Sequence, residues 1–348
     1  YDGQNVLKSS YIGLRILQGR GQESAGISVG DGKSIRTYKR KGAVADIFDD
    51  KILKILDNPA DTASIGHVRK FDVKNEDVIE PFELKDDNFR ISVAMDGKLF
   101  DQDKFKEYGV EFDKSTELLG KIFLKKLKEE EKTNEAAKKT MLELDRGYYS
   151  AVMLVNDGEK TREIGIRDPR GVKPYCIGKS GKTYFLSSES VALDSLNAEL
   201  LRDVKPGEFI EFTSENSEPV SEQLIASKPA FCAFEFNYGA SRASTIEGKS
   251  VDEFRKEMGK RIYEFYKNQI TKKGKVFPSP DSGRGVALGF AKASGFEYDE
   301  VVIKNPNTKR TFLIPDKDVR EFEASVKFSV VKKAVEDQIF YDGLFFLP

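Results

Sequence analysis

Several polar residues that could take part in catalysis or binding stand in short segments bounded by glycine. The segment Arg20–Gly26 (RGQESAG) places a cation, an amide and a carboxylate between glycines that permit close backbone approach. The segment Gly66–Arg69 (GHVR) holds the only histidine of the chain. From residue type alone, the first segment is either a site or a helix-to-strand turn, and His67 is either functional or a packed, hydrogen-bonded residue. A single histidine excludes a two-histidine metal site.

A third polar segment, Pro280–Gly283 (PDSG), precedes an expected helix that begins at Arg284. Small residues and main-chain N–H groups at the start of a helix suit a phosphate group. An ordinary strand-to-helix turn is the alternative, because the same residue types serve that purpose.

The elements before about residue 227 predict an α+β domain with layered sheets, because runs of strands are separated by helices. Apolar spacing predicts helices at 6–17 and 113–132. Alternating patterns between turn residues predict strands at 25–29, 34–38, 63–68, 90–95, 148–155, 163–167, 183–187 and 208–212.

The pattern changes near residue 227 and then alternates between helix and strand, which is typical of an α/β domain. Ser250–Glu253 forms a capping box that opens a helix. A strand at 275–277, the helix from Arg284 and a strand at 300–303 follow. We therefore expect two domains, 1–227 and 228–348.

The amino-acid composition limits the binding partners and the cellular compartment that we expect for this protein. Lys and Arg number 57 against 58 Asp and Glu, giving a net charge of −1. This balance argues against a nucleic-acid-binding protein, which would carry a basic excess. The two cysteines cannot form a disulfide framework, and no apolar run reaches the length of a membrane span. We expect a cytoplasmic protein with no nucleic-acid or membrane partner.

The polar segments, read in order, resemble the glutamine phosphoribosylpyrophosphate amidotransferase family. Leu17–Ile27 resembles the family's "LQHRGQESAGI" segment, and Gly66–Arg69 resembles "GHVRYST". Other segments that match in register are Ala94–Leu99, Arg167–Pro174, Ser187–Asp194, Val204–Glu208, Phe231–Glu235, Pro278–Arg284 and Lys304–Phe312.

The resemblance implies a fold and an activity. The first domain is expected to be a glutaminase of the N-terminal-nucleophile hydrolase type, an αββα sandwich. The second is expected to be a type I phosphoribosyltransferase, a parallel α/β sheet. Members release ammonia from glutamine in the first domain and pass it to phosphoribosyl pyrophosphate in the second, which yields phosphoribosylamine for purine synthesis.

The first domain departs from the family pattern at its expected chemistry. The family's nucleophile is an N-terminal cysteine, and Tyr1 falls past that position. The pair Asp96-Gly97 stands where the family has an Asn-Gly oxyanion hole, and an ionised carboxylate cannot donate to an oxyanion. Ser115 replaces the Asp that holds the glutamine amine, and Lys70-Phe71-Asp72 replaces "YST". Arg20 and Arg69 persist as glutamine-binding remnants.

The second domain is expected to be incomplete. Asp281, Ser282, Gly283 and Arg284 resemble the pyrophosphate loop, and Lys304 and Arg310 resemble the flexible loop, although Pro306-Asn307 replaces its Arg-Tyr. The Asp-Asp and Gly/Thr-rich segment that holds the ribose and its phosphate is missing between Lys332 and Ile339, which suggests a deletion.

No cofactor is expected for this chain. Family members use Mg²⁺, and some carry an iron–sulfur cluster. Cys232 matches one cluster ligand, but its partners are absent from the sequence, so no cluster is expected.

Three readings follow from these departures. The first is a homologue without activity that acts as an assembly or regulatory partner, as a homo-oligomer or with an intact paralogue. The second is an active amidophosphoribosyltransferase whose nucleophile and ribose-phosphate loop are missing from the sequence. The third is a binding module that keeps an anion pocket at 281–284 for a nucleotide or phosphate. Asp96, Ser115 and Lys70–Asp72 favour the first, because no missing segment explains them.

Overall fold

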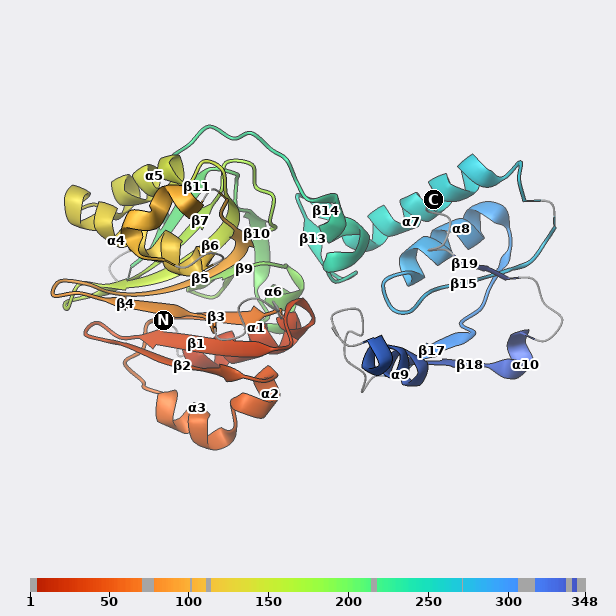
Figure 1. Ribbon diagram of the computed structural model, residues 1–348, viewed down its shortest axis with the longest axis horizontal. Coiled ribbons are helices and arrows are strands. Elements are labelled where there is room, and N and C mark those ends of the chain that lie inside the picture. Colours follow the sequence, from red (N-terminus) through yellow and green to blue (C-terminus); the bar gives the residue numbers. More distant parts are fainter. Residues whose placement is uncertain are drawn as a thin grey trace. The chain divides into compact units, whose positions relative to one another are not determined.

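The computed structural model describes residues 5–70, 78–100, 102–110, 114–213, 218–270, 272–305, 317–335 and 340–342 (Figure 1). The chain divides into two compact units. The first is Tyr1–Glu235 with Ile246–Gly248, and the second is Phe236–Thr245 with Lys249–Pro348. No helix in these described ranges is long and apolar enough to cross a bilayer.

The strands of the first unit form antiparallel sheets. One sheet has the order β2-β1-β3, with bounds Ile35–Lys41, Ser24–Gly30 and Ala63–Arg69. A second has the order β10-β8-β9, with bounds Glu199–Asp203, Cys176–Ser180 and Thr183–Ser187. A six-stranded sheet has the order β12-β11-β7-β6-β5-β4, with bounds Val220–Gln223, Glu208–Phe212, Thr161–Arg167, Tyr148–Asn156, Arg90–Lys98 and Phe82–Lys85.

Helices cover these sheets on both sides and complete four layers (Figure 1). Helices α4 (Ser115–Glu130) and α5 (Thr133–Glu143) pack on the six-stranded sheet through a core that includes Ile122 and Phe123. Helix α1 (Val6–Leu17) packs on β1 and β3. Between the sheets, β3 meets β5 and β6 through Ile65, Ala94 and Leu154. The remaining helices of this unit are α2 (Val44–Ile47), α3 (Asp50–Leu56), α6 (Val191–Ser195), and the 3₁₀ segments Gln18–Arg20 and Gln102–Tyr108.

The second unit pairs strands in parallel around β15, as the alternating pattern predicted, whereas β17 (Val302–Lys304) and β18 (Phe328–Val330) pair antiparallel. Strand β15 (Lys275–Phe277) lies parallel to β16 (Glu297–Tyr298) and to β19 (Phe340–Asp342). The capping box is confirmed in part, because the Ser250 hydroxyl accepts from the Glu253 N–H at the start of α7 (Val251–Tyr266). The other elements are Glu235–Gly239 (a π-helix), β13 (Thr245–Ile246), β14 (Lys249–Ser250), α8 (Arg284–Ser294), β17 (Val302–Lys304), α9 (Lys317–Lys327), β18 (Phe328–Val330) and α10 (Lys332–Val335).

Glycines bring α7 and α8 into close backbone contact. A Cβ atom on Gly259 would lie 1.9 Å from the Val286 carbonyl oxygen, and one on Gly289 would lie 1.8 Å from that of Lys256. Because these neighbours are main-chain atoms, they cannot move aside without separating the helices. This crossing, with Val276, Ala287 and Phe290 beside it, forms the core of the second unit.

Replacing Gly289 by Ala is expected to destabilise the second unit by about 1–3 kcal/mol, because the added methyl group overpacks the helix crossing. Hydrogen exchange of the α7 and α8 amides, followed by mass spectrometry, measures the loss. The matched control is Gly13→Ala in α1, where an added Cβ meets no atom within 4 Å. That change is expected to be neutral or stabilising, because Ala favours a helix over Gly by about 1 kcal/mol. Unchanged exchange in Gly289→Ala would contradict the close-packing argument.

Candidate functional site

Charged side chains from distant parts of the first unit meet in one buried group, which we call the Arg20 cluster. It consists of Arg20, Asp96, Lys173, Glu189 and Glu235. The Arg20 guanidinium lies 2.7 Å from the Asp96 carboxylate, 2.8 Å from that of Glu189 and 3.0 Å from that of Glu235. The Lys173 ammonium lies 3.1 Å from Asp96 and 3.2 Å from Glu235. Each cation therefore bridges at least two carboxylates.

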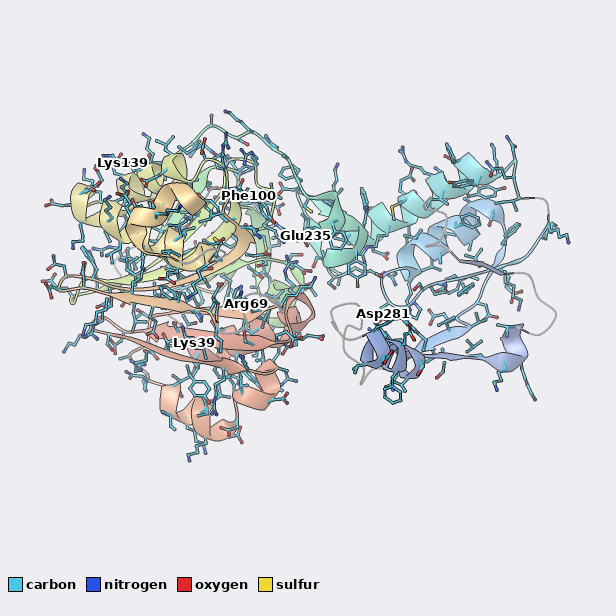
Figure 2. The ribbon with its side chains drawn as sticks, viewed as in Figure 1. Lys39, Arg69, Phe100, Lys139, Glu235 and Asp281 are labelled. Carbon is cyan, nitrogen blue, oxygen red and sulfur yellow. The ribbon has the colours of Figure 1, made fainter. Side chains whose placement is uncertain are left out.

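The elements of the fold explain how these side chains meet. Arg20 ends the 3₁₀ turn after α1, Asp96 lies on β5, and Lys173 lies in the loop between β7 and β8. Glu189 follows β9, and Glu235 opens the π-helix (Figure 2). The close approach of main chain at Gly21 supports this arrangement, since a Cβ there would lie 2.4 Å from the carbonyl carbon of Arg69.

The cluster fixes Asp96 in its charged form. Burial alone would raise the pKa of Asp96, but the positive charges of Arg20 and Lys173 outweigh it and hold this pKa well below its usual range. Burial would lower the pKa of Lys173, and the charges of Asp96 and Glu235 reverse that effect and raise it. Asp96 is therefore an acceptor at neutral pH, and each of its oxygens already faces a cation.

Asp96 and Gly97 are the pair that the family resemblance equates with the oxyanion hole. Gly97 has a φ of +154°, and a Cβ there would lie 2.1 Å from the Tyr148 carbonyl oxygen, so only glycine fits. The backbone at position 97 therefore has a conformation that requires glycine, while the residue before it, Asp96, carries a carboxylate.

The other predicted residues of the first unit have structural partners. The Arg69 guanidinium donates a hydrogen bond to the Val78 carbonyl (Figure 2 labels Arg69). The Ser115 hydroxyl accepts from the Leu99 N–H at 3.1 Å. His67 lies with Nε2 at 3.7 Å from the Glu80 carboxylate, and its buried Nδ1 has no hydrogen-bond partner among the described residues. Lys70 is described, whereas Tyr1, Phe71 and Asp72 lie outside the described residues.

In the second unit, the structure brings predicted loop residues together. The Lys304 ammonium lies 2.8 Å from the Asp281 carboxylate, and the Arg284 guanidinium lies 3.4 Å from it (Figure 2 labels Asp281). Arg284 also donates to Glu300 at 3.2 Å, and its Nε is buried without a partner in the described part of the chain. Ser282 and Gly283 complete the turn into α8, and Arg310 lies outside the described residues.

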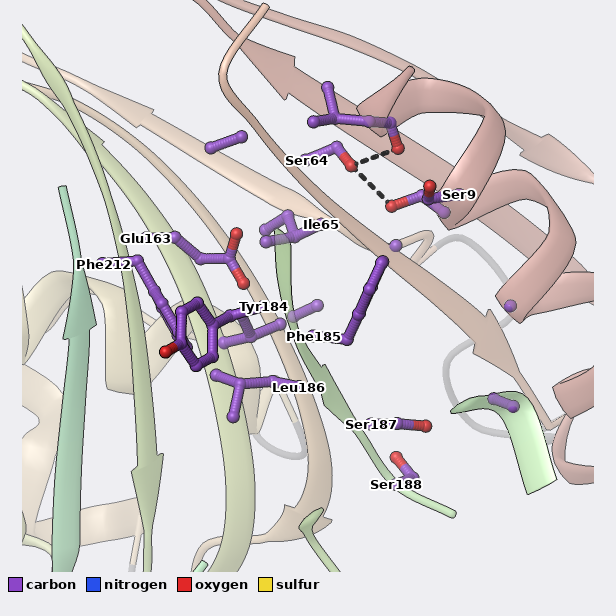
Figure 3. Close-up of a pocket in the computed structure, with 18 of the residues that line it drawn as sticks. Ser9, Ser64, Ile65, Glu163, Tyr184, Phe185, Leu186, Ser187, Ser188 and Phe212 are labelled. Carbon is purple, nitrogen blue, oxygen red and sulfur yellow. Dashed lines mark hydrogen bonds between the residues drawn. The ribbon is translucent and has the colours of Figure 1, made fainter. Parts of the chain in front are cut away.

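A cavity of about 230 Å³ in the first unit is the feature that the sequence did not predict (Figure 3). Its walls come from α1, β3, β5, β6, β7, β9 and neighbouring loops, and include His67 and Asp96. Glu163 on β7 also lines it. The available signal was an acidic residue directly before the apolar residues Ile164 and Ile166 of an expected strand. Within the described residues, no group of three or more His, Cys, Asp or Glu is arranged to hold a metal ion.

Comparison with known proteins identifies relatives over nearly the whole chain. No family model matches the sequence. The amidophosphoribosyltransferase of Methanocaldococcus jannaschii is 36% identical over 360 aligned positions, covering 97% of this chain and 74% of the relative. Those of Pyrococcus horikoshii and Archaeoglobus fulgidus are 36% and 35% identical, each covering 96% of this chain and 72% of the relative.

Solved structures agree with the sequence comparison. Glutamine phosphoribosylpyrophosphate amidotransferase from B. subtilis, complexed with ADP and GMP, superposes with a TM-score of 0.83 at 28% identity. The match covers 97% of this chain and 72% of that one. This fold is the one that the resemblance predicted, with a glutaminase part and a phosphoribosyltransferase part. Because relatives more than 30% identical align with almost all of its residues, the chain belongs to the amidophosphoribosyltransferase family.

Proposed function

We propose that this family member does not hydrolyse glutamine and acts as an assembly or regulatory partner in purine biosynthesis. The observation that carries the proposal is the ionised Asp96, held between Arg20 and Lys173 where the family resemblance expects a neutral amide. An oxyanion hole works because donors point at the charge that develops in the transition state. Asp96 has no proton to donate, and its charge opposes a second negative charge nearby.

The expected loss of rate is large. Removing a single oxyanion donor costs about 10²–10³ in rate in a well-studied hydrolase, and a carboxylate in its place adds repulsion. Moving Asp96 out of the way is unfavourable, because Arg20 and Lys173 would lose a buried partner.

The alternative is an active amidophosphoribosyltransferase. Two observations favour it: Arg20 and Arg69 lie beside the same turn, and Asp281, Arg284 and Lys304 come together in the second unit. The relative from B. subtilis was solved with ADP and GMP. We propose that the second unit of this chain likewise takes a nucleotide or phosphate at Pro280–Arg284, with Lys304 beside it, in a cytoplasmic protein without a nucleic-acid partner.

The assembly role is supported by an exposed apolar stripe on α9. Val319, Phe322 and Val326 lie on one face at helical spacing and are 50%, 64% and 40% exposed. Phe328 and Val330 on β18 are also exposed. Contiguous apolar surface of this kind marks a contact with another chain.

The protein with an N-terminal Cys in the family position is expected to release no more glutamate from glutamine than a heat-killed sample, and adding Asp96→Asn to it is expected to raise the rate by about 10² or more. The gain follows because the amide restores a donor and removes the charge. A coupled glutamate assay measures both, with Asp145→Asn, an exposed carboxylate outside the cluster, as the control. Wild-type hydrolysis matching that of the Methanocaldococcus jannaschii enzyme would refute the proposal and favour the active alternative.

The same substitution is expected to destabilise the first unit by about 1.5–3 kcal/mol at pH 7, because buried charged hydrogen bonds are lost. The pKa of Asp96 is depressed on folding, so its contribution is present above the unfolded value of about 3.9 and is lost as the pH falls below it. Urea unfolding of wild type and Asp96→Asn should therefore converge as the pH drops from 7 towards about 3. A difference that is constant over this range would show that Asp96 is not a charged partner in the folded protein.

We expect this chain to associate with a second copy or with a family enzyme. Light scattering after size-exclusion chromatography measures the molar mass of the complex. Either the chain alone, or its mixture with a full-length family enzyme from the same cells, should show a mass above that of one chain. Phe322→Glu should shift the mass towards a single chain, because a charge in an apolar contact is costly. Phe265→Glu, which changes an exposed aromatic residue on α7, is the control. A single-chain mass in both samples would contradict the assembly role.

A further inference from the structure

Arg167 is a second buried arginine of the first unit. Its side chain is 1% exposed, and its Nη2 donates to the Glu247 carboxylate at 2.7 Å. The same guanidinium donates to three main-chain carbonyls, those of Gly171 at 2.8 Å, of Lys173 at 2.9 Å and of Val204. A buried guanidinium stays charged, so a carboxylate is needed to offset the cost of its burial.

The carboxylate that pairs with Arg167 comes from the tip of a β-hairpin. Glu247 and Gly248 join β13 to β14, with φ values of +50° and +69°. Positive φ at both positions is the geometry of a type I′ turn, in which glutamate is an unusual choice because its Cβ is crowded there. The contact of the side chain, and not the turn, therefore explains the residue type at position 247.

The hairpin tip is also fixed on both sides of Glu247. Ile246 is 3% exposed, and the Gly248 N–H donates to the Asp203 carboxylate at 3.1 Å. The segment Ile246–Gly248 belongs to the first unit, whereas the residues directly before and after it belong to the second. The contacts of the tip are therefore internal to the first unit, and they give the Glu247 carboxylate a defined position.

Arg167 connects this tip to the Arg20 cluster. Its Nη2 binds both Glu247 and the Gly171 carbonyl, and its Nε binds the Lys173 carbonyl. One planar group thus joins the tip to both ends of the segment 171–173. The Lys173 ammonium in turn lies 3.1 Å from Asp96. A continuous chain of contacts therefore runs from the hairpin tip to the carboxylate of Asp96.

Other contacts hold parts of this loop without Glu247. The Asp168 carboxylate accepts from the N–H groups of Arg170 and Gly171, which closes the turn before position 171. The Ser150 hydroxyl donates to the Lys173 carbonyl at 3.3 Å. Hydrogen bonds from a charged donor are roughly twice as strong as neutral ones. The bond from the guanidinium is therefore the stronger hold on the Lys173 carbonyl.

We propose that Glu247 is a positioning residue for the Arg20 cluster. It acts from the hairpin tip through Arg167, which holds Lys173 beside Asp96. Without the Glu247 carboxylate, the buried guanidinium loses its ion pair and turns towards water. Its bond to the Lys173 carbonyl is then lost and the loop loosens. The hairpin tip is thus a clasp on Asp96, because lifting it removes one of the two cations that keep Asp96 ionised. The clasp is independent of the proposed loss of glutamine hydrolysis, because its contacts determine only how Lys173 is held.

A double-mutant cycle on the full chain tests the clasp, with urea unfolding of the first unit at pH 7 as the measurement. Glu247 and Asp96 bind different cations, and changes at independent sites combine additively to within about twofold in the unfolding constant. If Glu247 holds Lys173, the factor by which Asp96→Asn raises the unfolding constant should be about fivefold or more smaller in Glu247→Ala than in wild type.

Acetylation of the Lys173 amine, followed by mass spectrometry under native conditions, is a second measurement. Glu247→Ala should raise its rate about fivefold or more, because the loop opens more often. Glu247→Asp keeps a carboxylate and tolerates positive φ, so its rate should return towards that of wild type. Glu159→Ala, at an exposed position in the turn between β6 and β7, is the matched control. Lys39, which donates to the Pro81 carbonyl, reports on general loosening.

Coupling in the cycle, together with faster acetylation of Lys173 but not of Lys39, supports the clasp. Additive effects, or a folded Glu247→Ala in which Lys173 reacts as slowly as in wild type, would show that Glu247 only seats the hairpin. Equal acceleration at Lys39 and Lys173 would count against it as well, since the effect would then be general. Should Glu247→Ala not fold, Glu247→Gln, which removes the charge and keeps the shape, takes its place under the same criteria.

Discussion

The Arg20 guanidinium is the interaction on which the first unit's architecture depends. It joins Asp96, Glu189 and Glu235, which lie 76, 169 and 215 residues away in the chain. Bringing so many charges out of water is unfavourable unless each one keeps its partners, because a lone buried charge costs several kcal/mol. The cluster therefore restricts five separate segments at once: the turn after α1, strand β5, the loop between β7 and β8, the turn before α6 and the start of the π-helix. It also explains why the carboxylate of Asp96 is unavailable for chemistry at neutral pH.

Much of the fold was predictable because apolar residues recur at the spacings typical of helices and strands. Strands β1, β3, β5 and β9 and helices α1 and α8 appear within a few residues of their predicted bounds. Helix α5 was missed because its buried side consists of Ala136, Ala137, Thr140 and Met141, which give no strong apolar stripe. The short helices α2 and α3 were missed for a similar reason, since so few turns leave little periodicity to detect.

The candidate site was predictable only in part. Arg20, Arg69 and Asp96 were singled out by their resemblance to family segments; Arg20 pairs with Asp96, and the main chain of Arg69 lies against Gly21, beside Arg20. The roles of Lys173, Glu189 and Glu235 in that group could not be predicted, because each partner is distant in sequence and no local pattern links them. Glu163 was missed because it stood at the start of a predicted strand, where an acidic residue commonly faces solvent. Which face of a strand is buried depends on the neighbouring sheet, and that information is not local.

Two acidic residues on the same sheet illustrate how the surroundings decide what a carboxyl group does. Asp96 on β5 and Glu163 on β7 both line the cavity, and burial pushes the pKa of each upward. Cations stand beside Asp96, so its pKa falls and it becomes a fixed structural charge. No cation stands beside Glu163 in the described chain, so its pKa rises and it is poised to change charge near neutral pH. The same burial therefore leaves Asp96 ionised, because Arg20 and Lys173 offset its cost, and leaves Glu163 largely protonated at neutral pH, because no positive charge offsets it.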